Sequence, residues 1–439
     1  MLNKQRWLML AATAAMTAAQ PALAGQGAPV QTDMSTKAIE LPKTSAFAKQ
    51  FVTDDRAPGI VVAVGTDGDA PTFVTEGVIA DGSEQKATPD TLWRVYSMTK
   101  PITAMAAMTL IEDGKMSLDQ PVSDFIPAFK DMQVLVSPDT DSMESRPAKH
   151  PITIRNLLTH TAGLGYSIVT KGALLKAYEK NGILPATISR GYEQGVRASR
   201  PESLEEFANR VAKLPLIADP GTKWSYSIGL DVMGRVIEVA SGMPFDRYVQ
   251  TRILDPLKMQ STYWTVPADQ KARLATNYIW MGDTRVPLDP GATSVFLDPP
   301  SFPYGGAGLV MSARDYDRFL HMLQNGGSLD GARVMKPETV ALAMSNLLPD
   351  GVTYSSVDGA TGGSAGPKMG FGAGGSVYLE DVPGGPGKGT YGWGGAAGTI
   401  AWVDPERHVR GTVMVNYIPA DKWPLRREIV SRVYSDLGK

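Results

Sequence analysis

The apolar run from Ile102 to Ile111 constrains the fold more than any other segment of this 439-residue chain. Its apolar side chains recur at helical spacing, so the run predicts a buried helix over Pro101–Glu112. Proline is tolerated in a helix only within the first turn, where its missing N–H has no helical partner. The helix therefore starts close to Pro101, with Ser97-Met98-Thr99-Lys100 in its first turn.

Ser97 and Lys100 have the spacing of neighbours on one helical turn, which brings the amine within reach of the hydroxyl. A serine alone is a poor nucleophile, but an adjacent amine without its proton can accept the hydroxyl proton as attack begins. Backbone N–H groups at the same helix start can face a developing negative oxygen. The segment predicts a nucleophile, a base and part of an oxyanion site, although a polar helix start without catalysis has the same pattern.

Two other serine motifs are weaker. Ser83-Glu84-Gln85-Lys86 repeats the spacing in a polar turn with no apolar run behind it, so we interpret it as a solvated loop. Gly362-Gly363-Ser364-Ala365-Gly366 matches the esterase pattern Gly-x-Ser-x-Gly, which requires a preceding strand and a following helix. Here a stretch with glycine precedes the motif and Pro367 follows it, so we interpret this motif as a loop too.

Residues 1–24 have the pattern of a secretory leader. Lys4 and Arg6 precede an apolar stretch, and Ala22-Leu23-Ala24 is a small-x-small cleavage site. We expect cleavage after Ala24 and a periplasmic or secreted protein. The chain has no cysteine, so its stability must come from a hydrophobic core and not from disulfides.

The remaining composition narrows the partners. Without Lys4 and Arg6, the 43 basic residues become 41 against 45 acidic ones, which favours neither nucleic acid nor an anionic membrane. No later apolar run reaches the ~18 residues of a spanning helix. The four histidines do not occur at the spacing of metal ligands; they are His150, His160, His321 and His408. We expect no cofactor, no metal and a small-molecule partner; the sequence does not specify the oligomeric state.

The order of predicted elements indicates an α+β fold. Strands are predicted at 59–66 and 71–78, after a loose lead-in at 25–44. Helical pieces and polar loops at 118–300 predict an inserted, mostly helical lobe. The remaining parts, 25–117 and 301–439, predict one domain with an antiparallel sheet flanked by helices. Its later strands are expected at 305–311, 370–379, 389–395, 399–403 and 411–417, its helices at 313–324 and 425–437, and a mobile loop at 352–375.

Tyr226 is a second candidate for chemistry. It follows Pro220-Gly221-Thr222 and precedes the helical pattern that begins at Leu230. A tyrosine there can simply anchor a loop on the core. Alternatively, its phenol can carry a proton between Ser97 and the leaving group. We interpret His160, near an apolar helix end, as structural, and Asp404 with His408 as too far from a credible serine to form a triad.

With these residues, the chain resembles the serine β-lactamase and penicillin-binding-protein superfamily, in particular its class C-like branch and the family VIII carboxylesterases. The resemblance runs from about Phe47 to Val433 and implies a β-lactamase-like fold. Its motifs are Ser97-Met98-Thr99-Lys100-Pro101, the segment Thr153 to Leu164, Pro220-Gly221-Thr222 with Tyr226-Ser227, the segment Gly305 to Leu309, and Asn325-Gly326-Gly327. By that similarity Ser97 is acylated, Lys100 is the general base, and Tyr226 assists proton transfer.

Two departures from the lactamase motifs bear on the substrate. Tyr226-Ser227-Ile228 replaces Tyr-x-Asn, which removes an amide, and Trp393-Gly394-Gly395 stands where Lys-Thr-Gly is expected. Losing that ammonium removes the partner for a substrate carboxylate, an interaction of ~1.5 to 3 kcal/mol. A tryptophan offers an apolar face to a neutral group instead, as in the esterase branch. The N–H of Ala396, beside that of Ser97, is our candidate for a second oxyanion donor.

The sequence thus predicts a cofactor-free serine hydrolase that cleaves neutral, short-acyl esters. Three alternatives stay open: a β-lactamase or D-alanyl-D-alanine carboxypeptidase, a receptor that is acylated without turnover, and an acyltransferase to an acceptor other than water.

Overall fold

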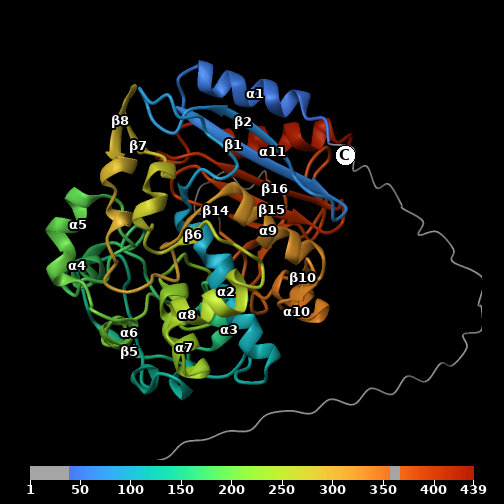
Figure 1. Cartoon of the computed structure of the whole chain (residues 1–439). Coiled ribbons are helices and arrows are strands. Elements are labelled where there is room, and N and C mark those ends of the chain that lie inside the picture. Colours follow the sequence, from blue (N-terminus) through green and yellow to red (C-terminus); the bar gives the residue numbers. More distant parts are fainter. Residues whose placement is uncertain (1–38, 356–365) are drawn as a thin grey trace, which may run out of the picture. The chain divides into compact units, whose positions relative to one another are not determined.

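A seven-stranded antiparallel sheet organises residues 38–439, which form one compact unit. The computed structural model describes residues 39–355 and 366–439. The strand order is β12-β13-β14-β15-β16-β1-β2, so the N-terminal β1 lies between its hairpin partner and a strand near the C-terminus (Figure 1). The strands are β1 (Gly59–Thr66), β2 (Thr72–Gly77), β12 (Met369–Phe371), β13 (Ser376–Tyr378), β14 (Tyr391–Gly394), β15 (Ile400–Asp404) and β16 (Val409–Met414).

Both faces of this sheet are covered. Successive side chains of a strand point to opposite faces, and in β1 Ile60, Val62 and Val64 belong to one buried cluster while Val61 belongs to another. The first cluster is completed by α1 (Pro42–Thr53) and α11 (Leu425–Asp436). The second is the larger core, which contains α2 (Thr99–Glu112) and α9 (Ala313–Gln324) on the other side of the sheet (Figure 1).

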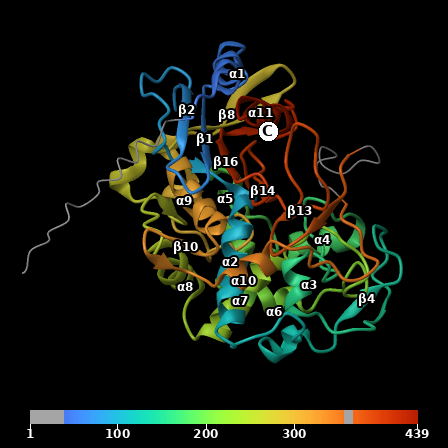
Figure 2. The ribbon, with the colours of Figure 1, turned by 90° about the vertical axis from the view of Figure 1, so that its right-hand side faces the viewer.

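Helix α2 is the centre of the larger core. Every residue from Thr99 to Leu110 is buried, which confirms the predicted buried helix, and the helix starts two residues earlier than expected. Apolar residues occur on all sides of this helix, so it can be enclosed in the core although it contains Lys100 and three buried threonines. Helices α7, α8 and α10 pack against it (Figure 2). The remaining α-helices are α3 (Ile154–Leu158), α4 (Gly172–Lys180), α5 (Arg190–Val196), α6 (Leu204–Val211), α7 (Gly229–Ser241), α8 (Phe245–Val249) and α10 (Pro337–Ala343).

Four small sheets lie outside the main one. Three have two or three very short strands: β3 (Trp93–Arg94) with β9 (Val310–Met311) and β6 (Thr262–Tyr263), β4 (Gln133–Leu135) with β5 (Ser145–Pro147), and β10 (Ser328–Leu329) with β11 (Ala332–Arg333). The fourth contains β7 (Asn277–Met281), β8 (Thr284–Asp289) and β17 (Tyr417–Ile418). Strand β3 leads directly to the turn that carries Ser97.

Four local predictions differ from the structure. Only 310–311 of the predicted strand 305–311 is extended in a ladder, because the Gly305 carbonyl and both polar groups of Gly306 bind side chains instead. The predicted strand 370–379 is a hairpin of β12 and β13, and Gly374 at the turn has a φ of +72°, which suits glycine. The predicted mobile loop 352–375 contains β12 near its end, and its residues 356–365 lie outside the described residues. The predicted lead-in 25–44 is too long, because α1 begins at Pro42.

The other predicted strands and helices of the sheet domain are present within a few residues of their expected bounds. The predicted leader with its cleavage site, and Ser364, lie outside the described residues. The division of the mature chain at residues 118 and 301 stays a prediction. In the parts that the structure describes, none of the helices combines the length and apolar character needed to cross a membrane.

Candidate active site

Ser97, Lys100 and Tyr226 lie together. Ser97 is in a short 3-10 turn, Tyr96–Met98, that runs directly into α2 and places Lys100 in the next turn. The Lys100 Nζ lies 3.2 Å from the Ser97 Oγ. The Tyr226 hydroxyl donates a hydrogen bond to the same oxygen at 2.6 Å, from the loop before α7. The hydroxyl of Ser97 is thus in contact with an amine and a phenol at once.

Lys100 is completely buried, and its amine is held by more than Ser97. It donates to the carbonyl oxygen of Gly306 at 2.6 Å. Its Nζ also lies 4.6 Å from the centre of the Tyr226 ring and 5.7 Å from that of Tyr166, distances at which an aromatic face attracts a cation. These contacts aim the amine at the serine, as a proton acceptor must be aimed.

Asp231 is a member of the site that the sequence analysis missed. This buried carboxylate in the first turn of α7 accepts the N–H of Gly306 at 2.7 Å, so it anchors the same peptide group that holds Lys100. Burial raises the pKa of Asp231 to about 6, against the opposing effect of Lys100. The signal in the sequence was an acidic residue flanked by the apolar residues Leu230 and Val232.

The pH dependence of stability tests the burial of Asp231. A raised pKa means that the folded protein keeps this proton to higher pH than the unfolded chain, so the contribution of Asp231 to stability falls as pH rises from about 4 to about 6. Asp231→Asn retains an acceptor for Gly306 but does not titrate. We expect the wild type to lose about 2 to 3 kcal/mol relative to this variant between about pH 4 and pH 7, in urea unfolding. A difference that does not change with pH would contradict the expectation.

His160 occupies the space behind Tyr226. Its Nδ1 accepts the N–H of Ser227 at 3.2 Å and pairs with the Ser227 hydroxyl at 2.8 Å, so the ring carries its proton on Nε2. Burial, assisted by the charge of Lys100, holds its pKa well below the usual range. The ring packs edge-on to that of Tyr226 at 4.9 Å. Its contacts are those of the structural histidine that we expected, and it also supports the phenol.

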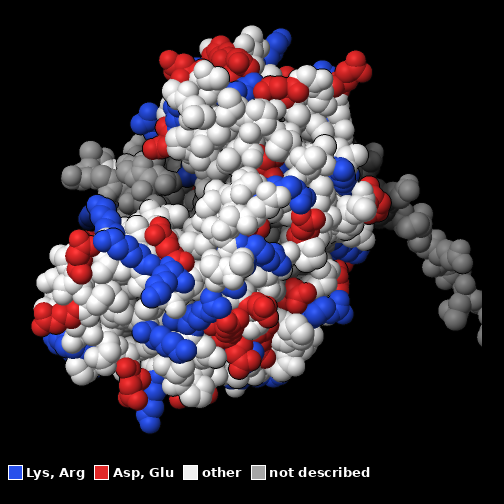
Figure 3. Space-filling view, turned by 90° about the vertical axis from the view of Figure 1, so that its left-hand side faces the viewer, with Lys and Arg blue, Asp and Glu red and all other residues white. Residues whose placement is uncertain are grey.

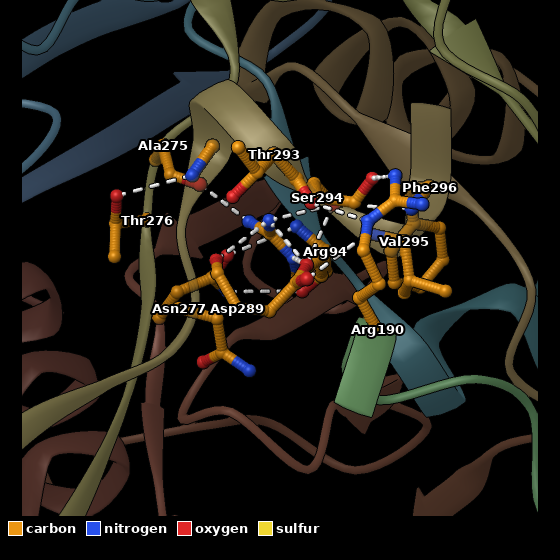
Figure 4. Close-up of polar contacts among 12 residues, drawn as sticks. Arg94, Arg190, Ala275, Thr276, Asn277, Asp289, Thr293, Ser294, Val295 and Phe296 are labelled. Carbon is orange, nitrogen blue, oxygen red and sulfur yellow. Dashed lines mark hydrogen bonds and ion pairs between the residues drawn. The ribbon is translucent and has the colours of Figure 1, made fainter. Parts of the chain in front are cut away.

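The turn that carries the nucleophile is fixed by a buried ion pair. Tyr96 has a φ of +42°, a left-handed conformation that costs a non-glycine residue free energy. Two residues earlier, the completely buried Arg94 lies 2.6 Å from a carboxylate oxygen of Asp289. Figure 4 shows the same guanidinium surrounded by the carbonyls of Ala275 and Asp289 and the hydroxyl of Ser294. This network connects β3 to the end of β8, to the segment after β8 and to the segment before β7.

The remaining predicted site residues lie in β14 and in the two positions that follow it. Trp393 is half-buried, and its ring lies 5.8 Å from that of Tyr226 and 5.2 Å from that of Phe371. A Cβ added to Gly395 would lie 2.3 Å from the carbonyl oxygen of Val95, so this glycine packs against the residue two before Ser97. Ala396 follows and is exposed. The structure therefore places the strand end beside the nucleophile turn.

The other candidates lie elsewhere. Ser83 and Lys86 belong to a largely exposed stretch outside the helices, as expected. Asp404 does not pair with His408; its carboxylate accepts the hydroxyl of Tyr434 at 2.7 Å and backbone N–H groups. Within residues 39–355 and 366–439, no group of three or more His, Asp or Glu could hold a metal ion. On the face in Figure 3, basic and acidic side chains are interspersed.

Comparison with known proteins places this geometry in a family. The family model described as Beta-lactamase matches residues 44–429. The chain belongs to the beta-lactamase family. Protein Rv1367c of Mycobacterium tuberculosis is 33% identical over 335 residues, 75% of this chain and 78% of that protein. Esterase EstB of Burkholderia gladioli is 30% identical over 380 residues, 82% of this chain and 86% of EstB.

A solved structure has a similar fold. The hydrolase EstCE1, described as having promiscuous acyltransferase activity, superposes with a TM-score of 0.72 at 25% identity and covers 90% of this chain and 98% of its own. The predicted fold class, α+β and β-lactamase-like, and the predicted class of enzyme, a serine hydrolase related to β-lactamases, are therefore confirmed.

Within the beta-lactamase family, the site departs from the motifs of lactamases at two positions. Ile228, in the place of the asparagine of Tyr-x-Asn, is buried, and Lys100 is instead held by the Gly306 carbonyl. Lys388, the lysine nearest to Trp393 in sequence, is exposed in the turn before β14, where its N–H binds Asp381. Trp393, which stands where the lysine of Lys-Thr-Gly is expected, places its indole beside Tyr226.

Proposed function

We propose that this enzyme hydrolyses neutral, short-acyl carboxylic esters through an acyl-enzyme on Ser97. The observation that carries the proposal is the convergence of Lys100 Nζ, at 3.2 Å, and Tyr226 OH, at 2.6 Å, on the Ser97 oxygen. Two proton-transfer groups on one hydroxyl suit a reaction in which a proton must leave the nucleophile and reach the departing alcohol.

The proposed reaction has two halves. Ser97 Oγ attacks the ester carbonyl carbon while its proton moves to the Lys100 amine, which accepts it only in its unprotonated form. The tetrahedral intermediate collapses, the bond to the alkoxy oxygen breaks, and Tyr226 delivers a proton to the departing alcohol, to be replenished from Lys100. Water then attacks the acyl-enzyme, gives up a proton to the same pair, and releases the carboxylic acid as the proton returns to Ser97.

The preference for a neutral substrate rests on Trp393. An aromatic face beside the site favours an apolar acyl or alcohol group and offers no charge to a carboxylate. Phe371 extends this apolar surface, because its ring lies 5.2 Å from that of Trp393. The names of related proteins such as Esterase EstB support an ester as the substrate.

From the leader pattern of residues 1–24, we also propose that the enzyme acts outside the cytoplasm.

Substrate comparison tests the proposal. We expect the enzyme to turn over short p-nitrophenyl esters with a kcat/KM at least ~10-fold above that for a chromogenic cephalosporin, since the latter carries a carboxylate without a cationic partner. Efficient cephalosporin hydrolysis with negligible ester turnover would favour a β-lactamase or peptidase. A stable adduct on Ser97 without steady-state product would favour a receptor.

Acyl transfer is a second candidate, because EstCE1 is described as having that activity and an acyl-enzyme can react with any nucleophile that reaches it. Adding a short alcohol to the ester assay and measuring the transesterified product beside the free acid distinguishes transfer from hydrolysis.

A further inference from the structure

The peptide group between Gly395 and Ala396 has an unusual set of partners for a strand end. The carbonyl oxygen of Gly395 accepts the N–H of Gly398 at 3.2 Å and a second hydrogen bond from the Arg426 guanidinium. The N–H of the same peptide group belongs to Ala396, and it donates to no group of the described residues. The N–H of Ser97 also has no acceptor among them. The two donors assigned to the oxyanion site are thus both available.

Arg426 reaches this peptide from the opposite face of the sheet. It belongs to α11, which packs with α1 on the face away from α2, and its side chain is half-buried. A hydrogen bond from a charged guanidinium is roughly twice as strong as a neutral one. Because the C=O and N–H of a trans peptide point in opposite directions, a donor fixed on the carbonyl also fixes and polarises the N–H.

Gly394 provides the space for this contact. Alternation along β14 directs Trp393 toward Tyr226, and residue 394 toward α11. A Cβ added to Gly394 would lie 2.7 Å from the Cζ and 2.9 Å from an Nη of Arg426, closer than real Cβ atoms come to a neighbour. The absence of a side chain at 394 therefore leaves the volume that the guanidinium occupies.

We propose that Arg426 is a positioning residue for the oxyanion site, and that Gly394 is required for it. The inference rests on the proposed function, in which Ser97 Oγ bonds to the ester carbon and the carbonyl electron pair moves to oxygen. Arg426 holds the Gly395–Ala396 peptide so that the Ala396 N–H faces that oxygen, and its positive charge on the far side of the peptide strengthens the donor.

Single-turnover acylation by p-nitrophenyl acetate measures the effect. We expect Arg426→Ala to lower the acylation rate roughly tenfold, less than the ~10²- to 10³-fold of deleting an oxyanion donor outright, while the dissociation constant of the substrate changes little. The inhibition constant of a methyl trifluoromethyl ketone, which forms a tetrahedral oxyanion with the serine, should rise by the same factor. Arg426→Lys should recover part of both losses, and Arg427→Ala, at the exposed neighbouring position of α11, should change neither.

A double-mutant cycle tests the link to Gly394. Gly394→Ala should displace the guanidinium and reproduce the loss, and the combined variant should be no slower than Arg426→Ala alone, because both changes remove one interaction. Additive losses would overturn the link. If Arg426→Ala does not fold, Arg426→Lys and Gly394→Ala test the same contact.

The outcomes separate the two proposals. An unchanged acylation rate and ketone affinity in Arg426→Ala, with Ser97→Ala inactive, would overturn the role of Arg426 and leave the proposed function intact. Retained turnover in Ser97→Ala would overturn the proposed function itself.

Discussion

Replacing Ser97 with alanine is expected to lower kcat/KM for a short p-nitrophenyl ester at least ~10³-fold, because it deletes the atom that forms the covalent bond to the acyl group. The substitution removes an oxygen whose partners are Lys100 and Tyr226, so it leaves the backbone of the turn unchanged. Steady-state kinetics and intact-mass detection of an acyl adduct, present in the wild type and absent from the variant, measure the effect.

Two other serines serve as matched controls for Ser97. Ser83→Ala changes the second Ser-x-x-Lys copy, and Ser364→Ala changes the Gly-x-Ser-x-Gly match. Neither variant should lower kcat/KM appreciably. A large loss on changing Ser364, with the Ser97 variant still active, would transfer the nucleophile to the glycine-rich segment.

Asp289→Ala is expected to destabilise the protein by about 3 to 5 kcal/mol, since it leaves the charge of Arg94 buried without its partner. Both side chains are almost completely inaccessible, with exposed fractions of 0% for Arg94 and 1% for Asp289. The free energy of unfolding in urea measures the loss.

The exposed ion pair of Asp119 and Arg155 is a control for this prediction. Their Oδ1 and Nε are 2.7 Å apart, but 73% of the Asp119 side chain is exposed, so Asp119→Ala should cost at most about 1 kcal/mol. Equal losses for Asp119→Ala and Asp289→Ala would mean that burial does not govern the contribution of Asp289.

Local patterns in the sequence were sufficient to predict the main helices and strands of the sheet domain. The run after Pro101 and the strand 59–66 are continuous apolar segments, and both are buried as expected. Local spacing also placed Lys100 one turn after Ser97, because i and i+3 neighbours depend only on helix geometry. The place of Tyr226, 129 positions away from Ser97, came from a family motif and not from spacing.

The residues that the sequence did not reveal are those whose roles depend on tertiary contacts. Asp231 and Gly306 interact across 75 positions, and an acidic residue in the first turn of a helix does not identify its partner. The glycine-rich segment at 305–309 was misinterpreted as a strand because its apolar residues have no periodicity that distinguishes a ladder from a turn held by side chains. Arg94 and Asp289, 195 positions apart, were missed for the same reason.

The place of β1 in the sheet has a consequence for how the chain is made. One edge of β1 pairs with β2, which follows at once, but the other pairs with residues 409–414. During synthesis that edge has no native partner until nearly the whole polypeptide has emerged, and contacts over such a sequence separation form slowly. We therefore expect the main sheet to stay incomplete while the chain is being synthesised. A truncation that removes the last few dozen residues would leave one edge of β1 without its native neighbour.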